Sequence, residues 1–371
     1  MPRRTATLLA STLLLIAMLC AGVLIKVPYA EMSPGPTVNT LGVHDGDPVL
    51  NIKDKPGDKG EPKKYDTSGH LNMTTVRVTG SEYHMTLLGA LSGWVSDDSL
   101  VVPHKTLYPE DKSAEEVDQE NAEEFTASQE SAKVAALKEL DLPVSSYVAV
   151  GSVEKGAPAH KRLHAGDAIT AVDGKPVSQP EQVGLVVRMH KPGEKVSFTV
   201  IPAAEVKAAQ KEGKKPSSKD EEKVTVRTGK TKGKNTARVG ITTMLSHTFP
   251  FEIDIKLADI GGPSAGLMFA LGIVDKLTPT DLTGGKFVAG TGTIDDSGKV
   301  GEIGGIQMKT LAARKKGARF FLTPAGNCAT AAKARPDGLT LVKTSSMDDA
   351  LSALQKIRKG ETDKLSRCKA P

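Results

Sequence analysis

The chain has 371 residues, a formal net charge of +5 at pH 7 and three cysteines. This length predicts two or three domains beyond a membrane anchor. Aromatic residues make up only 4% of the sequence, too few for a surface on which nucleic-acid bases would stack. We therefore expect no nucleic acid among the partners.

The N-terminus predicts a single transmembrane anchor over residues 5–27. The run from Thr5 to Ile25 is uncharged and mostly aliphatic, long enough to cross a bilayer core of about 30 Å. Arg3 and Arg4 precede it, which predicts a cytoplasmic N-terminus and an extracytoplasmic remainder at the cell membrane. A cleaved signal peptide is the alternative, although its apolar region would be shorter and no Ala-x-Ala site follows the run.

The region over residues 33–140 shows fewer patterns. Met32–Thr37 contains two prolines and is expected to leave the membrane as a rigid segment. Residues 71–79 predict a strand, and residues 128–140 have the apolar spacing of a helix. Two polar stretches are expected to be exposed loops: residues 52–69 and 109–126.

Short β segments and one helix follow between residues 141 and 228. Residues 147–153 alternate like a strand, Gly156-Ala-Pro-Ala159 opens a short helix, and Asp173-Gly174 marks a tight turn. A helix over 181–190 and a strand over 195–201 complete the order. This order resembles that of a PDZ domain, which implies a β-sandwich or barrel-like unit.

The PDZ resemblance implies that an extended peptide tail of a substrate or regulator binds by adding to a sheet edge. Backbone N–H groups that capture its carboxylate would lie just before the first strand, at Ser145, Ser146, Tyr147 and Val148. A small β-domain with a purely structural role is the alternative. The lysine-rich stretch over 204–235 that follows predicts a solvated loop and linker, with binding to an anionic lipid or polymer as the alternative.

A serine near the middle of the C-terminal half stands where a nucleophile would be expected. Gly261-Gly262-Pro263 precedes Ser264, and the apolar run from Ala265 to Val274 predicts a buried helix. The hydroxyl would then lie at a helix N-terminus, beside N–H groups able to hold an oxyanion. A capping serine in a tight turn is the alternative interpretation.

Lys309 is the candidate base for this serine, because a serine at its ordinary pKa is a poor nucleophile. A lysine accepts a proton only when neutral, so its pKa would have to fall from about 10.4 towards about 7–8. The small apolar stretch Ile303–Ile306 and a helix beginning near Gln307 would supply the burial that lowers it.

Four blocks of the C-terminal region resemble the Lon protease family over residues 237–355. They are Gly262–Gly266, Thr291–Asp295, Ile303–Ala313 and Gly317–Pro324. The resemblance implies a Ser264–Lys309 dyad, with Thr291 hydrogen-bonded to the lysine and Gly262, Pro263 and Ala265 as supporting or oxyanion residues. Many members of the family carry an acidic residue where this chain has Gly261. Any role of that carboxylate is therefore absent here or passes to Asp259.

The sequence lacks the motifs of several other classes of protein. The only Gly-Lys-Thr, at 229–231, has Val224 where a phosphate-binding loop needs its first glycine. We expect no cofactor, and no His or Cys spacing predicts a metal site. No Gly-x-Ser-x-Gly elbow supports a Ser-His-Asp hydrolase. Outside the predicted anchor, Cys328 and Cys368 are the remaining cysteines, and the sequence allows either a disulfide between them or two free thiols.

The sequence thus predicts an α+β protein with a PDZ domain over 141–228 and a Lon-like proteolytic domain over 237–358. The segment over 33–140 is the candidate first part of that proteolytic domain, into which the PDZ unit would be inserted. The predicted function is an ATP-independent serine endopeptidase acting on protein or peptide substrates. A PDZ adaptor with an inactive protease fold is the alternative, and the oligomeric state, substrate and cleavage preference stay open.

Overall fold

A computed structural model describes residues 3–53, 63–109, 111–231, 233, 235–257 and 261–369. The chain divides into two compact units. Unit 1 joins Met1–Asn51, Lys64–Glu139 and Asp254–Pro371, and unit 2 contains Ile52–Lys63 and Leu140–Ile253. Unit 2 is therefore inserted in the sequence of unit 1, and residues 237–253, expected in the proteolytic domain, belong to unit 2.

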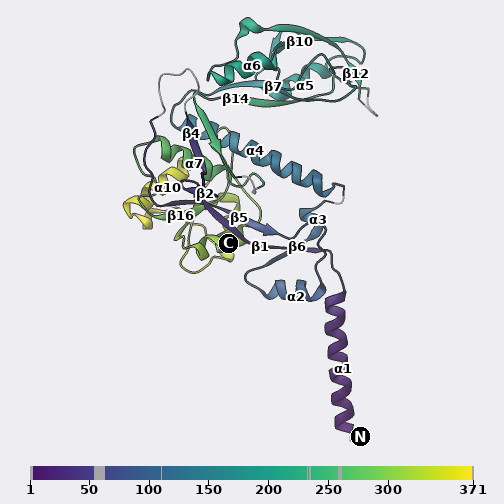
Figure 1. The fold of residues 1–371 in the computed structure, drawn as a ribbon, viewed down its shortest axis with the longest axis vertical. Helices are drawn as coiled ribbons and strands as arrows, with labels where there is room; N and C mark the ends of the chain where they lie inside the picture. Colours follow the sequence, from purple (N-terminus) through teal and green to yellow (C-terminus); the bar gives the residue numbers. More distant parts are fainter. Residues whose placement is uncertain are drawn as a thin grey trace. The chain divides into compact units, whose positions relative to one another are not determined.

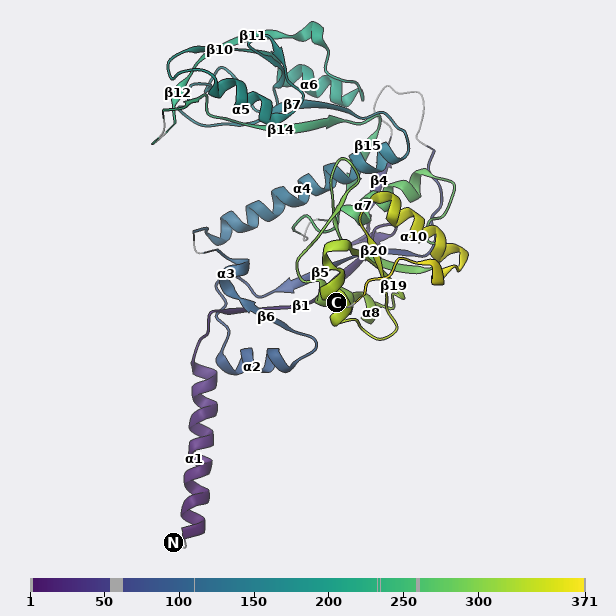
Figure 2. The same ribbon diagram turned by 180° about the vertical axis from the view of Figure 1, so that it is seen from behind.

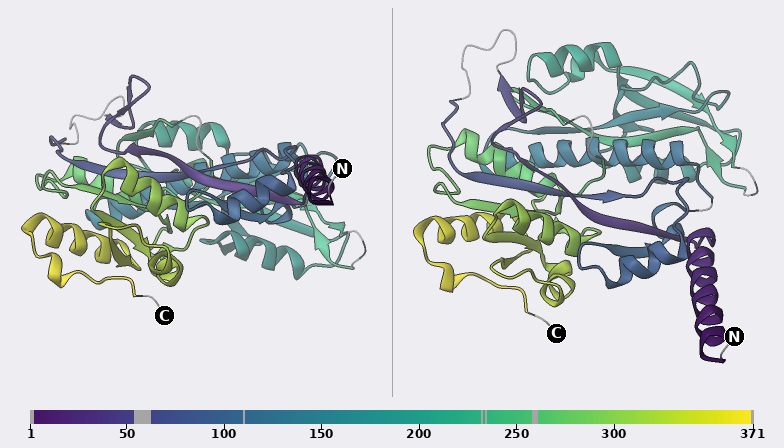
Figure 3. Two further views of the ribbon diagram at one scale, coloured as in Figure 1. Left: turned by 90° about the horizontal axis from the view of Figure 1, so that it is seen from below. Right: turned by 60° about the horizontal axis from the view of Figure 1, so that its bottom comes forward.

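Unit 1 begins with α1 (Arg3–Leu24), which Figure 1 shows leading away from the sheet. Thr7–Leu24 has a mean hydropathy of 2.4 and is long and apolar enough to cross a membrane, a test that a signal sequence also passes. Both panels of Figure 3 show β1 (Tyr29–Asn39) continuing from α1 into the sheet.

The core of unit 1 is a mixed sheet of six strands in the order β20-β19-β16-β5-β1-β6. The β1 strand pairs antiparallel with its two neighbours, whereas the pairs from β5 to β20 are parallel. Val288, Ala289, Phe321 and Leu322 are fully buried, as expected for parallel strands covered on both faces. The other strands are β5 (His70–Val78), β6 (Leu100–Pro103), β16 (Phe287–Gly290), β19 (Phe320–Pro324) and β20 (Thr340–Thr344).

Helices and short strands complete unit 1 and carry the chain between the sheet strands. The helices are α2 (Leu87–Val95), α3 (His104–Leu107), α4 (Ala114–Glu139), α7 (Gly266–Leu277), α8 (Ile306–Lys316), α9 (Cys328–Lys333) and α10 (Met347–Lys359), with 3-10 turns η2 (Ala325–Asn327) and η3 (Thr362–Lys364). The short strands are β2 (Val43–His44), β3 (Asp47–Pro48), β17 (Thr293–Ile294) and β18 (Val300–Gly301). The paired strands β4 (Leu50–Lys53) and β15 (Glu252–Ile255) contain residues of both units, because the chain passes from one unit to the other within them.

Unit 2 is a sheet in the order β11-β10-β8-β7-β14, with β9 paired to β8. Its core contains Val148, Leu163, Ile169 and Phe198, all almost completely buried. The elements are β7 (Ser145–Val153), β8 (Ala168–Val172), β9 (Lys175–Pro176), α5 (Pro180–Arg188), β10 (Lys195–Ile201), α6 (Ala203–Lys211), η1 (Ser218–Asp220), β11 (Glu222–Arg227), β12 (Gly229–Lys230), β13 (Ala237–Arg238) and β14 (Ile241–Thr248).

The polar stretch 109–126, expected to be a loop, is helical from Ala114 onward, so this prediction is wrong. Ser113 and Glu116 form a reciprocal capping box that starts α4: each side chain accepts a hydrogen bond from the other's backbone N–H, at 3.2 and 2.7 Å. Val117 and Phe125 are buried, and the Phe125 ring meets that of Phe269 edge to face. These contacts hold the charged first half of α4, and the buried Val134 and Leu137 hold its second half.

Two other extended segments also differ from the predictions. Met32–Thr37, expected as a rigid exit from the membrane, lies within β1 and pairs with β5, with a register shift between Pro34 and Thr37. Prolines donate no ladder hydrogen bond, and an irregular position in the strand accommodates them. The expected linker 204–235 contains α6 and β11, because Val206 and Val226 are buried. Residues 54–62 of the expected loop 52–69 lie outside the described residues.

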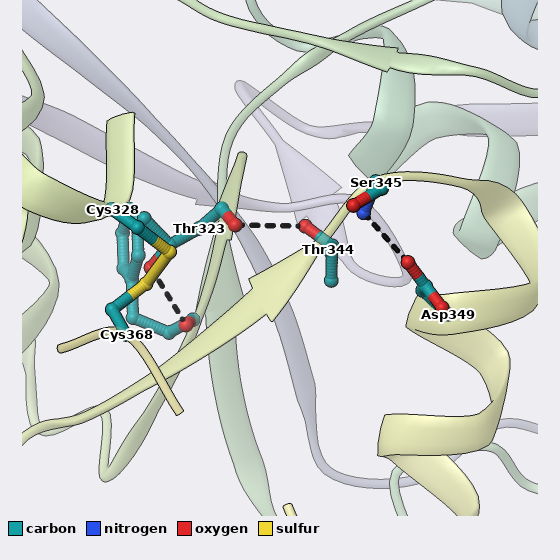
Figure 4. The surroundings of a disulfide bond; sticks show 7 residues. Thr323, Cys328, Thr344, Ser345, Asp349 and Cys368 are labelled. Carbon is teal, nitrogen blue, oxygen red and sulfur yellow. Dashed lines mark hydrogen bonds between the residues drawn. A yellow bond between two sulfur atoms is a disulfide. The ribbon is translucent and has the colours of Figure 1, made fainter. Parts of the chain in front are cut away.

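A disulfide joins Cys328 at the start of α9 to Cys368 near the C-terminus, a pairing that the sequence left open (Figure 4). The Cα atoms are 4.9 Å apart. Cys368 N–H also donates to Leu341 O in β20 at 3.0 Å. The bridge thus ties the C-terminal tail to α9, and the hydrogen bond holds the tail beside β20.

Candidate active site

Ser264 lies in the turn that leads into α7. Gly262 has a φ of +83°, in the left-handed region that glycine adopts at little cost, and Pro263 follows it. The Ser264 carbonyl accepts hydrogen bonds from Gly292 N–H and from Thr291 Oγ1, both at 2.9 Å. These two bonds hold the serine backbone against the segment between β16 and β17.

Lys309 lies one turn inside α8 and points into the protein. The helix begins after Gly305, whose φ of +67° reverses the chain. Lys309 is 3% exposed. Its Nζ is 2.6 Å from Ser264 Oγ and 3.2 Å from Thr291 Oγ1. The structure thus brings together the serine, the lysine and the threonine that the sequence singled out.

Burial lowers the pKa of Lys309 from 10.5 to about 7. Loss of hydration penalises the charged ammonium, whereas the neutral amine loses much less. No carboxylate of the described residues forms an ion pair with Lys309. A substantial fraction of Lys309 is therefore neutral near pH 7, and a neutral amine can accept the serine proton.

The other residues expected around the nucleophile have different positions. Gly262 N–H donates to Asn121 O at 3.0 Å, and Pro263, which has no N–H, accepts from Ser128 Oγ at 2.8 Å. Neither residue is thus placed to donate to an oxyanion, and both instead fix the turn to α4. Ala265 is buried and directly precedes α7. Asp259 lies outside the described residues.

Sequence reasoning missed the contribution of Asn121 and Ser128. Both lie on α4, whose first half the polar composition had assigned to a loop. The Asn121 contact is made by its backbone, so no side-chain pattern could indicate it. The capping pair Ser113 and Glu116 was the one signal for a helix at this position.

A cavity of about 710 Å³ opens beside the serine and lysine. Its walls come from β1, β5, α3, α4 and the segments before α7 and α8, and they are largely apolar. The lining residues are Met32, Val76, Val78, Leu107, Tyr108, Val117, Asp118, Asn121, Ala122, Gly261, Pro263, Ser264, Gly304 and Lys309. A cleft of this size accommodates several residues of an extended peptide.

The four residues expected to capture a peptide carboxylate are not in a loop. Ser145, Ser146, Tyr147 and Val148 lie within β7, and each pairs with a residue of β14 (Ile241–Thr248). Val148 also pairs with Ile169 of β8. Because β14 covers this edge of β7, a cleft of about 560 Å³ lies instead among β14, the end of β7 and α5 (Pro180–Arg188).

Comparisons with known proteins identify two regions of the chain. A sequence-family model for the Lon protease (S16) C-terminal proteolytic domain matches residues 258–355, and one for the PDZ domain matches residues 125–210. Two curated proteins named Lon protease are similar. The one from Chloroflexus aggregans is 39% identical over 93 residues, and the one from Roseiflexus castenholzii is 46% identical over 66 residues.

These alignments cover 24% and 18% of this chain, and the chain spans only 11% and 8% of the length of those relatives. Among solved structures, the PDZ domain of an SdrC-like protein from Listeria monocytogenes is 28% identical, with 26% of this chain and 87% of that chain covered and a TM-score of 0.20. The corresponding domain from Listeria innocua is 25% identical, with 28% and 98% covered and a TM-score of 0.21. By these matches, the chain contains a region of the Lon proteolytic-domain type and a region of the PDZ type.

Proposed function

We propose that this chain is a membrane-anchored serine endopeptidase that uses a Ser264–Lys309 dyad. The distance of 2.6 Å between Lys309 Nζ and Ser264 Oγ carries the proposal. A serine and a base within hydrogen-bond reach are the minimum for nucleophilic acyl transfer. The lowered pKa of Lys309 meets the second requirement, because a base works best when its pKa is near the working pH.

The reaction would begin when neutral Lys309 accepts the Ser264 hydroxyl proton as Oγ attacks the peptide carbonyl. The backbone N–H groups of Ser264 and Ala265, which make no hydrogen bond to the described part of the chain, would stabilise the oxyanion. Lys309 then gives its proton to the leaving amine. Water attacks the acyl-enzyme in the second half, with Lys309 again accepting and returning a proton.

The remaining parts of the proposal concern delivery and compartment. We infer that α1 anchors the chain with its N-terminus in the cytoplasm, because Arg3 and Arg4 precede the apolar run. The Cys328–Cys368 bridge fits an extracytoplasmic location, where disulfides persist. The sequence carries no phosphate-binding loop, so cleavage would need no ATP.

Because this sequence contains no motif of a motor that unfolds substrates, cleavage by this chain alone would depend on flexible segments. The cleft lined by Val183, Val187 and residues 237–243 is the candidate site for an extended tail of a substrate or regulator. Strand addition along β14 would supply the backbone hydrogen bonds, because β14 is the last strand of its sheet.

The test is cleavage of short peptides by the full chain in lipid nanodiscs, beside a Ser264→Ala control. We expect kcat/KM to rise with pH, with an apparent pKa near that of Lys309, about 7. Cleavage that persists in Ser264→Ala, or an acid limb that moves on substitution of a histidine instead, would contradict the dyad. A folded chain that binds peptides through unit 2 but never cleaves them would support the adaptor alternative.

A further inference from the structure

Helix α2 (Leu87–Val95) exposes its large apolar side chains and buries its small residues. Its large apolar residues point outward: Leu88 is 40% exposed, Leu91 47%, Trp94 53% and Val95 86%. Its buried residues are the small Ala90 and Gly93. A surface helix of a water-soluble domain normally buries its large apolar side chains and exposes polar ones. This exposed face therefore needs an apolar partner.

The buried face of α2 leaves no room for the opposite orientation. A Cβ atom at Gly93 would lie 2.6 Å from Val101 Cγ2, so only glycine fits against β6. Thr86 caps the helix, since its Oγ1 accepts from Gly89 N–H at 3.0 Å. The outward direction of Leu88, Leu91, Trp94 and Val95 is thus fixed by the packing beneath them.

The position of α2 identifies the partner. Leu87 N–H donates to Ile25 O, and Val27 N–H donates to Met85 O, both at 2.9 Å. The apolar helix α1 ends at Leu24, so α2 starts at the level where the candidate span ends. Figure 2 shows α2 beside this end of α1. A surface held at that level faces the boundary between lipid and water.

The aromatic residues near α2 suit this boundary. Trp94 packs edge to face against Tyr29, the first residue of β1, with ring centroids 5.5 Å apart. Tyr83, just before α2, is 50% exposed. Tryptophan and tyrosine are enriched where headgroups meet acyl chains. Leu87–Val95 contains no charged residue, so α2 can lie in this zone without burying a charge.

We propose that α2 is an interfacial helix that rests on the extracytoplasmic surface of the membrane in which α1 is anchored. Its exposed apolar side chains would insert at the headgroup level: Leu88, Leu91, Trp94 and Val95. The proposal depends on α1 being the membrane anchor proposed above. Strand β1 leads from Tyr29, which contacts Trp94, to Met32, which lines the cavity beside Ser264. The helix would therefore hold the candidate active site at a fixed height above the lipid.

Trp94 is the only tryptophan of the chain, so its fluorescence reports on α2 directly. The full chain is reconstituted in vesicles of phosphatidylcholine and phosphatidylglycerol, with or without phosphatidylcholine brominated on its acyl chains. We expect brominated lipid to reduce the emission by about twofold, and bromine near the headgroup end to quench more than bromine at the bilayer centre. Flotation of the vesicles reports separately whether α1 anchors the chain.

Leu91→Asp and Val95→Asp should each weaken the quenching while the chain stays on the floated vesicles. Met244→Asp is the matched control, since Met244 is 52% exposed but lies on β14, and it should leave the quenching unchanged. A floated chain whose Trp94 emission ignores brominated lipid would overturn the proposal for α2. Trp94 emission that ignores brominated lipid but shifts with the density of protein in the vesicles would also overturn the proposal. It would indicate that a second copy of the chain covers α2. A chain that does not float would instead disprove the anchor.

Discussion

Helix α7 (Gly266–Leu277) has a lysine of lowered pKa near each of its ends. Lys309 meets the turn before its first residue, and Lys276 belongs to its last turn. Burial is the main cause of both shifts, but the neighbours differ. Among the described residues, only the hydroxyls of Ser264 and Thr291 lie at the Nζ of Lys309, whereas Lys276 follows Asp275, whose charge acts to raise the pKa of the lysine.

This difference separates the candidate base from a lysine that has a carboxylate neighbour. A carboxylate next to a buried lysine stabilises the ammonium form and so opposes the lowering of its pKa. Hydroxyl groups carry no compensating charge, and burial alone then makes the amine neutral near pH 7. The absence of a paired carboxylate at Lys309, among the described residues, is thus part of what makes it suitable as a base.

The largest effect is expected from exchanging the two lysines for methionine, one at a time. Lys309→Met should lower kcat/KM by about 10³-fold or more, as should Ser264→Ala, and the double variant should lose no more than either single one. Lys276→Met should change kcat/KM by less than about threefold, because Lys276 is remote from the proposed chemistry. The measurement is peptide cleavage, with circular dichroism to confirm folding.

An equal loss of kcat/KM in Lys276→Met and Lys309→Met would contradict the different roles assigned to the two lysines. Substantial cleavage by a folded Lys309→Met variant would show that another group accepts the serine proton.

The second prediction concerns stability, because a buried lysine with a lowered pKa destabilises the fold when protonated. The unfolded chain binds more protons than the folded one between about pH 7 and 10.5, so the free energy of unfolding rises with pH in this window. Lys309→Met removes this dependence. It should be more stable than wild type by up to about 4 kcal/mol near pH 6, with the gain vanishing by about pH 10.

Urea unfolding across this pH range measures the gain, and Lys276→Met should show a smaller one. A constant difference between Lys309→Met and wild type at every pH would mean that Lys309 keeps its ordinary pKa in the folded protein.

Asp275, at the other end of α7, is expected to change stability with pH in the opposite direction. Burial raises the pKa of its carboxyl to about 6, although Leu282 N–H donates to Oδ1 at 2.8 Å. The folded protein then binds more protons than the unfolded chain between about pH 4 and 6, so stability falls as pH rises through this window. Asp275→Asn should abolish this fall, which we expect to be about 2 kcal/mol.

The same unfolding measurements, made between about pH 4 and 7, compare Asp275→Asn with wild type. Parallel curves for the two proteins would contradict a raised pKa at Asp275.

The comparison of the two ends also shows which parts of this site the sequence could predict. Ser264 and Lys309 stand in short motifs with glycines and small apolar residues around them, so the residue pattern itself indicated both. Asp275 and Lys276 directly follow the apolar run that ends at Val274 and carry no motif. Their burial depends on packing that only the tertiary structure reveals.

The same limit explains the errors in the fold. The helical spacing of α8 and the alternation in β7 and β10 are local patterns and gave the correct elements. The pairing of β14 with β7 joins Thr248 to Ser145, which are far apart in the sequence of unit 2, and no local pattern specifies such a partner. The sequence therefore could not indicate that Ser145–Val148 lie in a paired strand, and their role in capturing a peptide carboxylate stays a prediction.

The smallest expected effect tests the hydroxyl that links the two catalytic candidates. Thr291 Oγ1 donates to the Ser264 carbonyl at 2.9 Å and accepts from Lys309 Nζ at 3.2 Å, and the residue is fully buried. Thr291→Val keeps the volume but leaves both groups without this partner. We expect kcat to fall by about 10-fold to 100-fold with little change in KM, since a positioning role affects the chemistry more than binding.

Two further variants decide whether Thr291 acts through its hydroxyl. Thr291→Ser restores the oxygen and should recover most of kcat, whereas a loss caused by packing alone would persist. Thr278→Val is the control from the other end of α7, where Thr278 Oγ1 donates to Val274 O at 2.9 Å. Because that bond only closes the helix C-terminus, its loss should leave kcat and the pH profile unchanged. A fall in kcat as large for Thr278→Val as for Thr291→Val would mean that α7 as a whole, and not the hydroxyl beside Lys309, sets the rate.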